Sequence, residues 1–288
     1  MSWTTGDAKP FAIELDPPAT ADIRKFIAGA GELWNHGAAM ITLADCPFGM
    51  PRADSILLAC KLHREYGMEV LPHLACRDRN FNAIQASLMG MWAEEVRRVL
   101  LVTGDPIPQE RRDIVKGVFN GNSRKLISFT SELNRELFSE EPFQIYSALN
   151  VNARNFSVEL SLAQEKEQRG AVGFFTQPVL TDTALQNLIS ARQQLNGEIW
   201  GGIMPVISEK NARFLSASVS GISVSEQIIS AYIGADRQQG ESLAEEISVR
   251  IAEEMMPYID GYYLMTPFGR TGLVCRIMDG IRALSSAS

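Results

Sequence analysis

The chain has 288 residues, of which 45% are hydrophobic and 21% charged, so it carries enough apolar material for a large buried core. No apolar run approaches the roughly 20 residues that cross a bilayer, which argues against a membrane protein. The formal net charge of −7 argues against a general nucleic-acid binder, because such proteins neutralise phosphates with clustered Lys and Arg side chains.

Eight short apolar runs recur along the chain, and a stretch with helical spacing follows most of them. Strands buried on both faces of a parallel sheet read as continuous apolar segments of this kind. Eight such units in 288 residues predict an α/β fold, a single (β/α)8 barrel. With no linker and no internal repeat, we expect one domain over residues 1–288, with its core at about 11–284. The runs lie within 11–18 and at 38–42, 69–73, 99–103, 144–149, 172–176, 199–204 and 262–266.

The stretches between the runs predict the helices of the outer layer. The first is expected to begin with Thr20 as its N-cap and to stop at Gly37. Pro51 is expected to open the second, which continues to Gly67. Further helices are expected at about 80–95, 126–137, 156–169, 182–195, 208–219, 224–234, 240–256 and 271–284.

The amino terminus and the cysteines indicate a location. Residues 1–7 lack the basic start and apolar stretch of a secretory signal. The four cysteines are widely separated and form no C-x-x-C pair, and His73, Cys76 and Asp78 mix ligand types without a recurrent metal spacing. We therefore expect a protein of the reducing cytoplasm with no metal site.

Nearly every run ends in a polar or ionisable residue, which predicts a site at the carboxyl ends of the strands. The set is rich in acids and amides, and with one His and no Ser-His-Asp order it argues against a serine hydrolase. For single residues a structural alternative stays open: a carboxylate can cap a loop, and a His can bind a backbone carbonyl. The set is Glu14, Asp16, Thr42, Asp45, His73, Asp78, Thr103, Asp105, Asn150, Asn152, Thr176, Gln177, Thr266 and Arg270.

The turn at 103–106, Thr-Gly-Asp-Pro, follows an apolar run, and its glycine would let a large ligand approach the backbone closely. Taken alone, the same peptide is also an ordinary turn motif. The sequence has no G-x-G-x-x-G after a strand and no G-x-x-x-x-G-K-[ST], so neither a Rossmann site nor a P-loop is indicated. A nucleotide cofactor would have to be bound by the barrel itself.

Several segments, in the same order along the chain, resemble the methylenetetrahydrofolate reductase family. The resemblance spans about residues 11–270, and a further segment, 148–152, resembles the Asn-Pro-Asn version in reductase domains fused to homocysteine methyltransferases. We therefore expect a divergent subgroup. The segments are Glu14-Leu15-Asp16-Pro17-Pro18, Pro72-His73-Leu74-Ala75-Cys76, Gly104-Asp105-Pro106, Gly170-Ala171 with Thr176-Gln177-Pro178, and Gly202-Ile203-Met204-Pro205-Val206.

The resemblance implies a flavoprotein oxidoreductase that uses FAD to reduce 5,10-methylenetetrahydrofolate to 5-methyltetrahydrofolate, in one-carbon metabolism and methionine biosynthesis. It assigns the acid to Glu14, a place beside the flavin and pterin to Asp105, and orientation of the pterin to Gln177. Gln177 and Arg270 would bind the folate substrate. The implied cofactor-binding residues are Thr42, His73, Thr103, Gly104, Asp105, Asn150, Asn152 and Lys166.

Three positions leave alternatives open. Thr103 stands where many members have Arg, and Arg270 is offset by one residue from the expected folate arginine. Lys166 could instead be a solvated lysine paired with a neighbouring glutamate of its helix.

Two other functions also stay open for the whole chain: a folate-binding methyl- or methylene-transfer protein on the same barrel, and a subunit that needs an oxidoreductase partner. The electron donor would be NADH, NADPH or a reduced partner protein. We expect a homo-oligomer.

Overall fold

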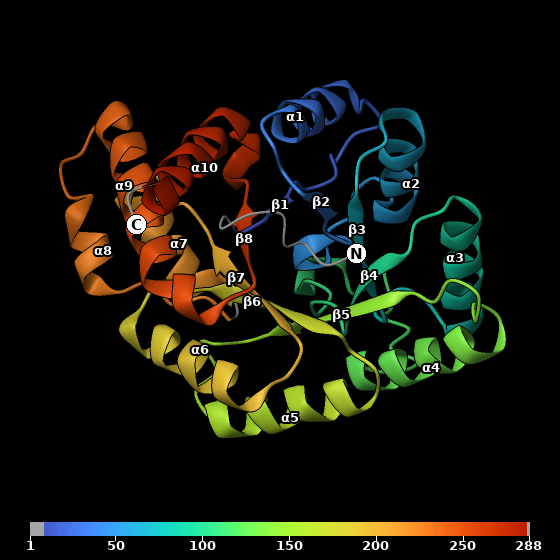
Figure 1. Cartoon of the computed structure of the whole chain (residues 1–288). Helices are drawn as coiled ribbons and strands as arrows, with labels where there is room; N and C mark the ends of the chain where they lie inside the picture. Colours follow the sequence, from blue (N-terminus) through green and yellow to red (C-terminus); the bar gives the residue numbers. More distant parts are fainter. Residues whose placement is uncertain (1–8, 220, 287–288) are drawn as a thin grey trace.

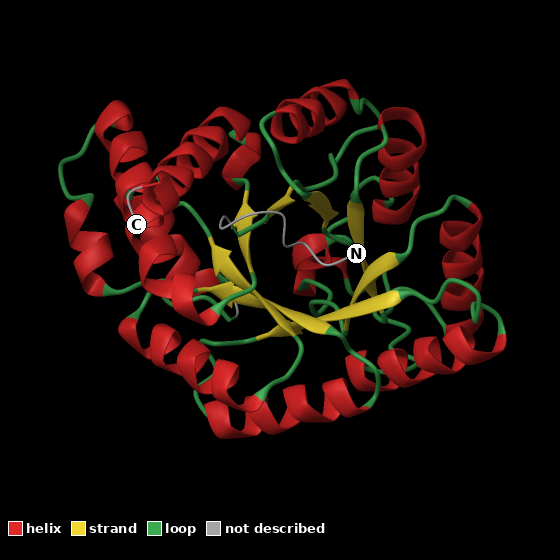
Figure 2. Ribbon diagram, viewed as in Figure 1, coloured by secondary structure: helices red, strands yellow, loops and turns green. Residues whose placement is uncertain are grey.

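The computed structural model describes residues 9–219 and 221–286. Its eight parallel strands close into a barrel in chain order, with β8 returning to pair with β1. Figure 2 shows these strands enclosed by helices, so the predicted (β/α)8 barrel is confirmed. The strands are β1 (Phe11–Glu14), β2 (Met40–Leu43), β3 (Val70–Ala75), β4 (Arg98–Val102), β5 (Gln144–Leu149), β6 (Gly173–Pro178), β7 (Glu198–Ile203) and β8 (Gly261–Met265).

The helices follow one another around the strands in chain order (Figure 1). None of the helices in the described part of the chain is long and apolar enough to cross a membrane. They are α1 (Arg24–Asn35), α2 (Ser55–Tyr66), α3 (Phe81–Ala93), α4 (Ser123–Glu136), α5 (Phe156–Gln168), α6 (Asp182–Gln194), α7 (Glu209–Ser218), α8 (Glu226–Ala231), α9 (Arg237–Met255) and α10 (Thr271–Ser286). Short 3-10 turns lie at Pro47–Gly49 (η1), Gln109–Arg111 (η2), Met256–Tyr258 (η3) and Pro267–Gly269 (η4).

The starts of the first two helices were predicted wrongly. Thr20 does not cap α1, which begins only at Arg24; its hydroxyl instead donates to the carbonyl of Asp22 at 3.3 Å. Pro51 does not open α2, because the carboxylate of Asp54 accepts from the backbone N–H of Leu57 at 2.9 Å and starts the helix after it. The other predicted helices lie within a few residues of the observed ones.

The barrel has two separate hydrophobic cores, one between the strands and the helices and one inside the strands. Inside, Phe175 stacks on Trp200 with ring centroids 5.4 Å apart and meets Tyr146 and Tyr263 edge-on at 5.5 Å and 5.0 Å. The interior is therefore filled by packed rings rather than open. The inner core consists of Ala12, Met40, Leu71, Leu100, Tyr146, Phe175, Trp200, Tyr263 and Met265.

This inner core fixes which later side chains point into the barrel. Side chains two apart along a strand share a face, so the residue two positions after an inner-core residue also points inward, one layer closer to the carboxyl ends. Ala12, Met40 and Leu71 are such inner-core residues. The residues two positions later are Glu14, Thr42 and His73. In β6 the register shifts between Phe175 and Pro178, so this rule does not place Gln177.

Candidate active site

Glu14 ends β1 with 18% of its side chain exposed, at the top of the filled barrel. Its Oε2 accepts a hydrogen bond from the phenol of Tyr263 and lies 3.7 Å from Nε2 of His73. Burial and the nearby Asp16 raise the pKa of Glu14 to about 8, while the bond from Tyr263 works in the opposite direction. Glu14 therefore holds a proton at neutral pH, as a general acid must.

His73 lies beside Glu14 on β3 and is almost fully buried. Burial lowers the pKa of its imidazole to about 4, and its Nε2 has no hydrogen-bond partner. At neutral pH the two neighbours are thus a protonated carboxyl and a neutral imidazole, not an ion pair. Within residues 9–219 and 221–286, no group of three His, Cys, Asp or Glu side chains is placed to hold a metal ion.

Tyr263 is a site residue that the sequence did not reveal. Its ring belongs to the inner core and is held edge-on by Phe175, which aims the hydroxyl at Glu14. Burial and the adjacent Glu14 raise the pKa of the phenol well above its usual value, so it remains a donor. The only signal in the sequence is its position two residues before Met265 on one strand face.

A cavity of about 510 Å³ opens above Glu14. This volume lies in the range of small-molecule sites. Arg52 lines it, with a buried Nε that has no hydrogen-bond partner, and its positive charge lowers the pKa of Asp16, which burial raises. Arg52 was also missed in the sequence, where it follows no strand directly. The other lining residues include Leu15, Pro17, Pro18, Pro47, Phe48, Met204, Asn211, Phe214, Leu215, Val219, Met265, Thr266, Pro267, Phe268 and Gly269.

Several buried polar atoms near the strand ends lack a protein partner. They are Oγ1 of Thr42, Nε2 of His73, Oδ1 of Asn152 and Oγ1 of Thr266, which belong to β2, β3 and the loops after β5 and β8. A buried polar atom without a hydrogen bond is costly, so native structures usually supply a partner. These atoms fit a polar ligand bound across the strand ends.

The turn after β4 has a steric requirement for glycine. Gly104 has φ +92°, and a Cβ there would lie 3.0 Å from the Cβ atoms of Ala75 and Arg77. The exposed Asp105 follows, and its Oδ2 accepts from the backbone N–H of Phe48 at 2.7 Å. This bond ties the turn after β4 to the wall of the cavity.

The side-chain amides of Asn150 and Asn152, in the loop after β5, make hydrogen bonds within the protein, but Oδ1 of Asn152 has no partner. Oδ1 of Asn150 accepts from the backbone N–H of Asn152 at 3.0 Å, and Nδ2 of Asn152 donates to the carbonyl of Pro178 at 2.9 Å. Gln177, at the end of β6, is half-buried.

Lys166 is not a solvated lysine. Only 8% of it is exposed, and its Nζ donates to the carbonyl of Ala148 on β5 at 2.7 Å. Burial lowers the pKa of the ammonium, while Glu159 favours the charged form.

Arg270 also has an internal partner, because its guanidinium pairs with Glu241 of α9.

Thr103 contributes to the start of α4. Its hydroxyl accepts from the backbone N–H of Ser123 at 3.0 Å, while Asn122 caps the same helix at Lys125. We expect Thr103→Val to lower the free energy of unfolding by about 1 kcal/mol, the usual effect of losing a cap. Urea titration of the variant measures this, with Thr103→Ser, which keeps the hydroxyl, as the control. A Val variant as stable as wild type would contradict the capping role.

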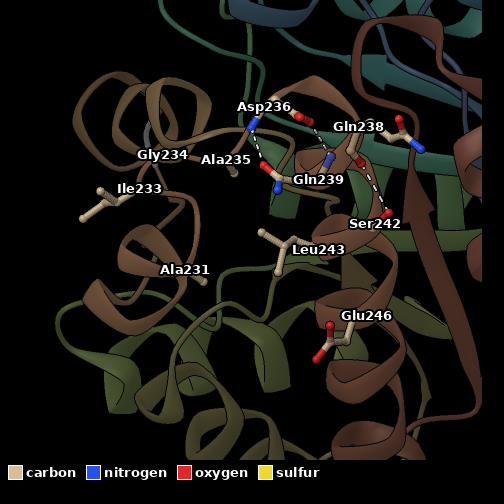
Figure 3. Close-up of a pocket in the computed structure, with 10 residues that line it drawn as sticks. All are labelled: Ala231, Ile233, Gly234, Ala235, Asp236, Gln238, Gln239, Ser242, Leu243 and Glu246. Carbon is tan, nitrogen blue, oxygen red and sulfur yellow. Dashed lines mark hydrogen bonds between the residues drawn. The ribbon is translucent and has the colours of Figure 1, made fainter.

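A second cavity, of about 720 Å³, lies on the flank of the barrel between α8 and α9 (Figure 3). Asp236 and Gln239 line it, but they bind each other's backbone in the capping box that begins α9. Ser242 donates to the carbonyl of Gln238. Because these polar groups are already paired, we place the site at the cavity above Glu14 instead.

A (β/α)8 barrel with a protonated carboxyl at the end of its first strand and a small-molecule cavity above it is typical of a barrel enzyme. The family model described as methylenetetrahydrofolate reductase matches residues 4–263. The chain belongs to the methylenetetrahydrofolate reductase family.

One individual protein is similar to the chain in sequence, and two solved structures are similar to it in fold. The 5,10-methylenetetrahydrofolate reductase of Buchnera aphidicola subsp. Baizongia pistaciae (strain Bp) is 21% identical over 230 residues, which cover 76% of this chain and 73% of that protein. An uncharacterized Clostridium thermocellum protein that binds two copies of 5-methyl-5,6,7,8-tetrahydrofolic acid shares the fold, with a TM-score of 0.65, 11% identity, and coverage of 98% and 96% of the two chains. Tryptophan synthase from M. tuberculosis also shares the fold, with a TM-score of 0.54 and 11% identity, and the match covers 95% of this chain and 93% of that one.

Proposed function

We propose that this protein catalyses the flavin-dependent reduction of 5,10-methylenetetrahydrofolate to 5-methyltetrahydrofolate. The observation that carries the proposal is Glu14, a carboxyl that keeps its proton at neutral pH because it is buried below a small-molecule cavity at the carboxyl ends of the strands. Membership of the reductase family supplies the reaction to which such an acid belongs.

Ring opening at the methylene carbon requires a proton on the departing nitrogen. Glu14 supplies it, since its pKa of about 8 keeps the carboxyl protonated but still able to release the proton. Tyr263 fixes the position of the carboxyl through its hydrogen bond. The neutral His73 adds no positive charge that would stabilise the carboxylate before the reaction.

The residues present fit FAD, which when bound supplies the hydride. The unpaired atoms of Thr42, His73 and Asn152 would hold its polar groups across the ends of β2, β3 and β5. Asn150 and the close-approach turn at Gly104 belong to the same proposed cofactor set. Lys166, Thr103 and Arg270 already have internal partners, so their roles in binding FAD or folate require a change of partner and stay predictions.

Asp105 and Gln177 complete the proposed catalytic set. Asp105 is held at the cavity wall by Phe48, where its charge would disfavour an anionic reduced flavin and so favour hydride donation. Gln177, half-buried on β6, would orient the pterin through its amide, which has both donors and an acceptor.

Asp105→Asn is expected to raise the reduction potential of bound FAD, because it removes a negative charge that destabilises the anionic reduced form. The amide keeps an oxygen that can accept from Phe48, so the turn is retained. Potentiometric titration of the two proteins in one buffer measures the shift, with Asp113→Asn, also in the segment between β4 and α4, as the charge control. An unchanged potential would place Asp105 away from the flavin.

The function is tested in two half-reactions. Purified protein is expected to show the absorption spectrum of bound flavin. Under anaerobic conditions, NADH, NADPH or a reduced ferredoxin is expected to reduce the flavin and bleach this spectrum. Methylenetetrahydrofolate is then expected to restore the spectrum and yield 5-methyltetrahydrofolate. A colourless protein that binds folate without reducing it would favour the methyl- or methylene-transfer function. Bleaching only by the protein donor would favour an oxidoreductase partner.

A further inference from the structure

The tripeptide Pro-Phe-Gly occurs in two matching turns, η1 after β2 and η4 after β8. The central residue has nearly the same backbone conformation in both, φ 56° and ψ 19° at Phe48 and φ 54° and ψ 29° at Phe268. Because β2 and β8 are the two neighbours of β1, the turns lie on either side of the strand that ends in Glu14.

The conformation of the two phenylalanines is unfavourable. A positive φ is uncommon for residues other than glycine and is an outlier for a bulky one, which persists only where the surroundings require it. The hydrophobic core does not require these rings, since 51% of Phe48 and 77% of Phe268 are exposed. The fold thus holds two strained aromatic residues whose rings contribute little to its packing.

Both rings line the cavity above Glu14. The first turn is also held by a charged group, because the carboxylate of Asp105 accepts from the N–H of Phe48. The second is closed by backbone bonds, in which the N–H groups of Gly269 and Arg270 donate to the carbonyls of Thr266 and Pro267. Turns whose backbone is already held before a ligand arrives lose little freedom on binding. Aromatic faces are suited to planar rings, which they bind by stacking.

We propose that Phe48 and Phe268 are paired aromatic platforms that hold a planar ring of the substrate next to Glu14. This rests on the proposed function, under which the substrate is a folate, with a pyrimidine and an aminobenzoyl ring available for stacking. The strained turns thereby set the position of the substrate relative to the proton of Glu14.

The test is equilibrium titration of the purified full chain with 5-methyltetrahydrofolate. Phe48→Leu and Phe268→Leu keep an apolar side chain but lose the aromatic face, and we expect each to weaken binding about 2- to 10-fold. Phe48→Gly and Phe268→Gly are expected to weaken it about 10-fold or more, without lowering the melting temperature, because glycine adopts this conformation freely. The control is Tyr66→Leu at the end of α2, an aromatic residue that is 47% exposed and lies outside the cavity; this variant should match wild type.

The outcomes separate the two proposals. If wild type binds 5-methyltetrahydrofolate and the Leu and Gly variants bind it equally well, the platforms are overturned and the proposed function stands. Gly variants that melt at lower temperature with unchanged affinity would give the rings a purely structural role and also overturn the platforms. Wild type that does not bind the folate would overturn both proposals.

Discussion

Glu14→Gln is expected to keep the barrel while slowing the reduction of methylenetetrahydrofolate by on the order of 10²- to 10⁴-fold, the usual loss when a general acid is removed. The amide preserves the shape of the side chain and an oxygen that accepts from Tyr263. Rapid mixing of reduced protein with the folate measures the half-reaction separately from reduction by the electron donor. A variant with the wild-type rate would remove Glu14 from the mechanism.

Although Glu14→Gln is expected to lose activity, we expect it to be more stable than wild type. The pKa of Glu14 is about 8 in the folded protein against 4.5 ordinarily, so the folded state binds more protons between these values. Stability contributed by this group therefore falls as pH rises through that window. A neutral Gln does not titrate, so Glu14→Gln should gain stability relative to wild type between pH 5 and pH 8. Urea midpoints at both pH values measure this, and a variant that loses stability instead would contradict the raised pKa.

Tyr263→Phe is expected to move the pH dependence of the folate half-reaction to higher pH. In wild type, the rate should fall tenfold per unit of pH above about 8, as Glu14 loses its proton. The phenol stabilises the carboxylate, so removing it raises the pKa of Glu14 further and extends the active range. The rate at pH 9 should therefore decline less steeply relative to pH 7 in the variant.

The control for this prediction is Tyr262→Phe. Tyr262 is the neighbouring residue on β8, but it packs in the core between strands and helices, and its hydroxyl donates to the carbonyl of Ala252 at 3.5 Å. Its pH profile should match wild type. Identical profiles for Tyr263→Phe and wild type would contradict a hydrogen bond to Glu14 in the reacting enzyme.

The strands could be predicted because burial on both faces leaves a continuous apolar run, whatever the partners are. The starts of α1 and α2 could not, since they depend on which polar side chain reaches the free N–H groups. Asp54 does so for α2, whereas Pro51, a good first helical residue, lies in the preceding loop. Local preference is a weak guide where several residues can cap the same end.

Residues of the candidate site could be predicted where the end of a single strand is enough to place the side chain. Glu14 and His73 each follow an apolar run. Because side chains alternate along a strand, both point into the barrel, on the same face as the inner-core residues two positions before them. Tyr263 could not be found this way, because its role appears only when β8 closes on β1. Lys166 was expected at the cofactor or in solvent, but its burial under β5 depends on how α5 packs there.

Because β8 pairs with β1 to close the barrel, the candidate site is completed only late in folding. Glu14 and Tyr263 are 249 positions apart, so their hydrogen bond is among the most distant contacts of the chain. Contacts of such separation form late, because the entropy of closing a long loop must be overcome first. A growing chain that has already released Glu14 from the ribosome has neither the phenol nor the second aromatic turn. The acid thus acquires its hydrogen-bond donor only with the last strand, and a chain whose barrel is still open carries an incomplete site.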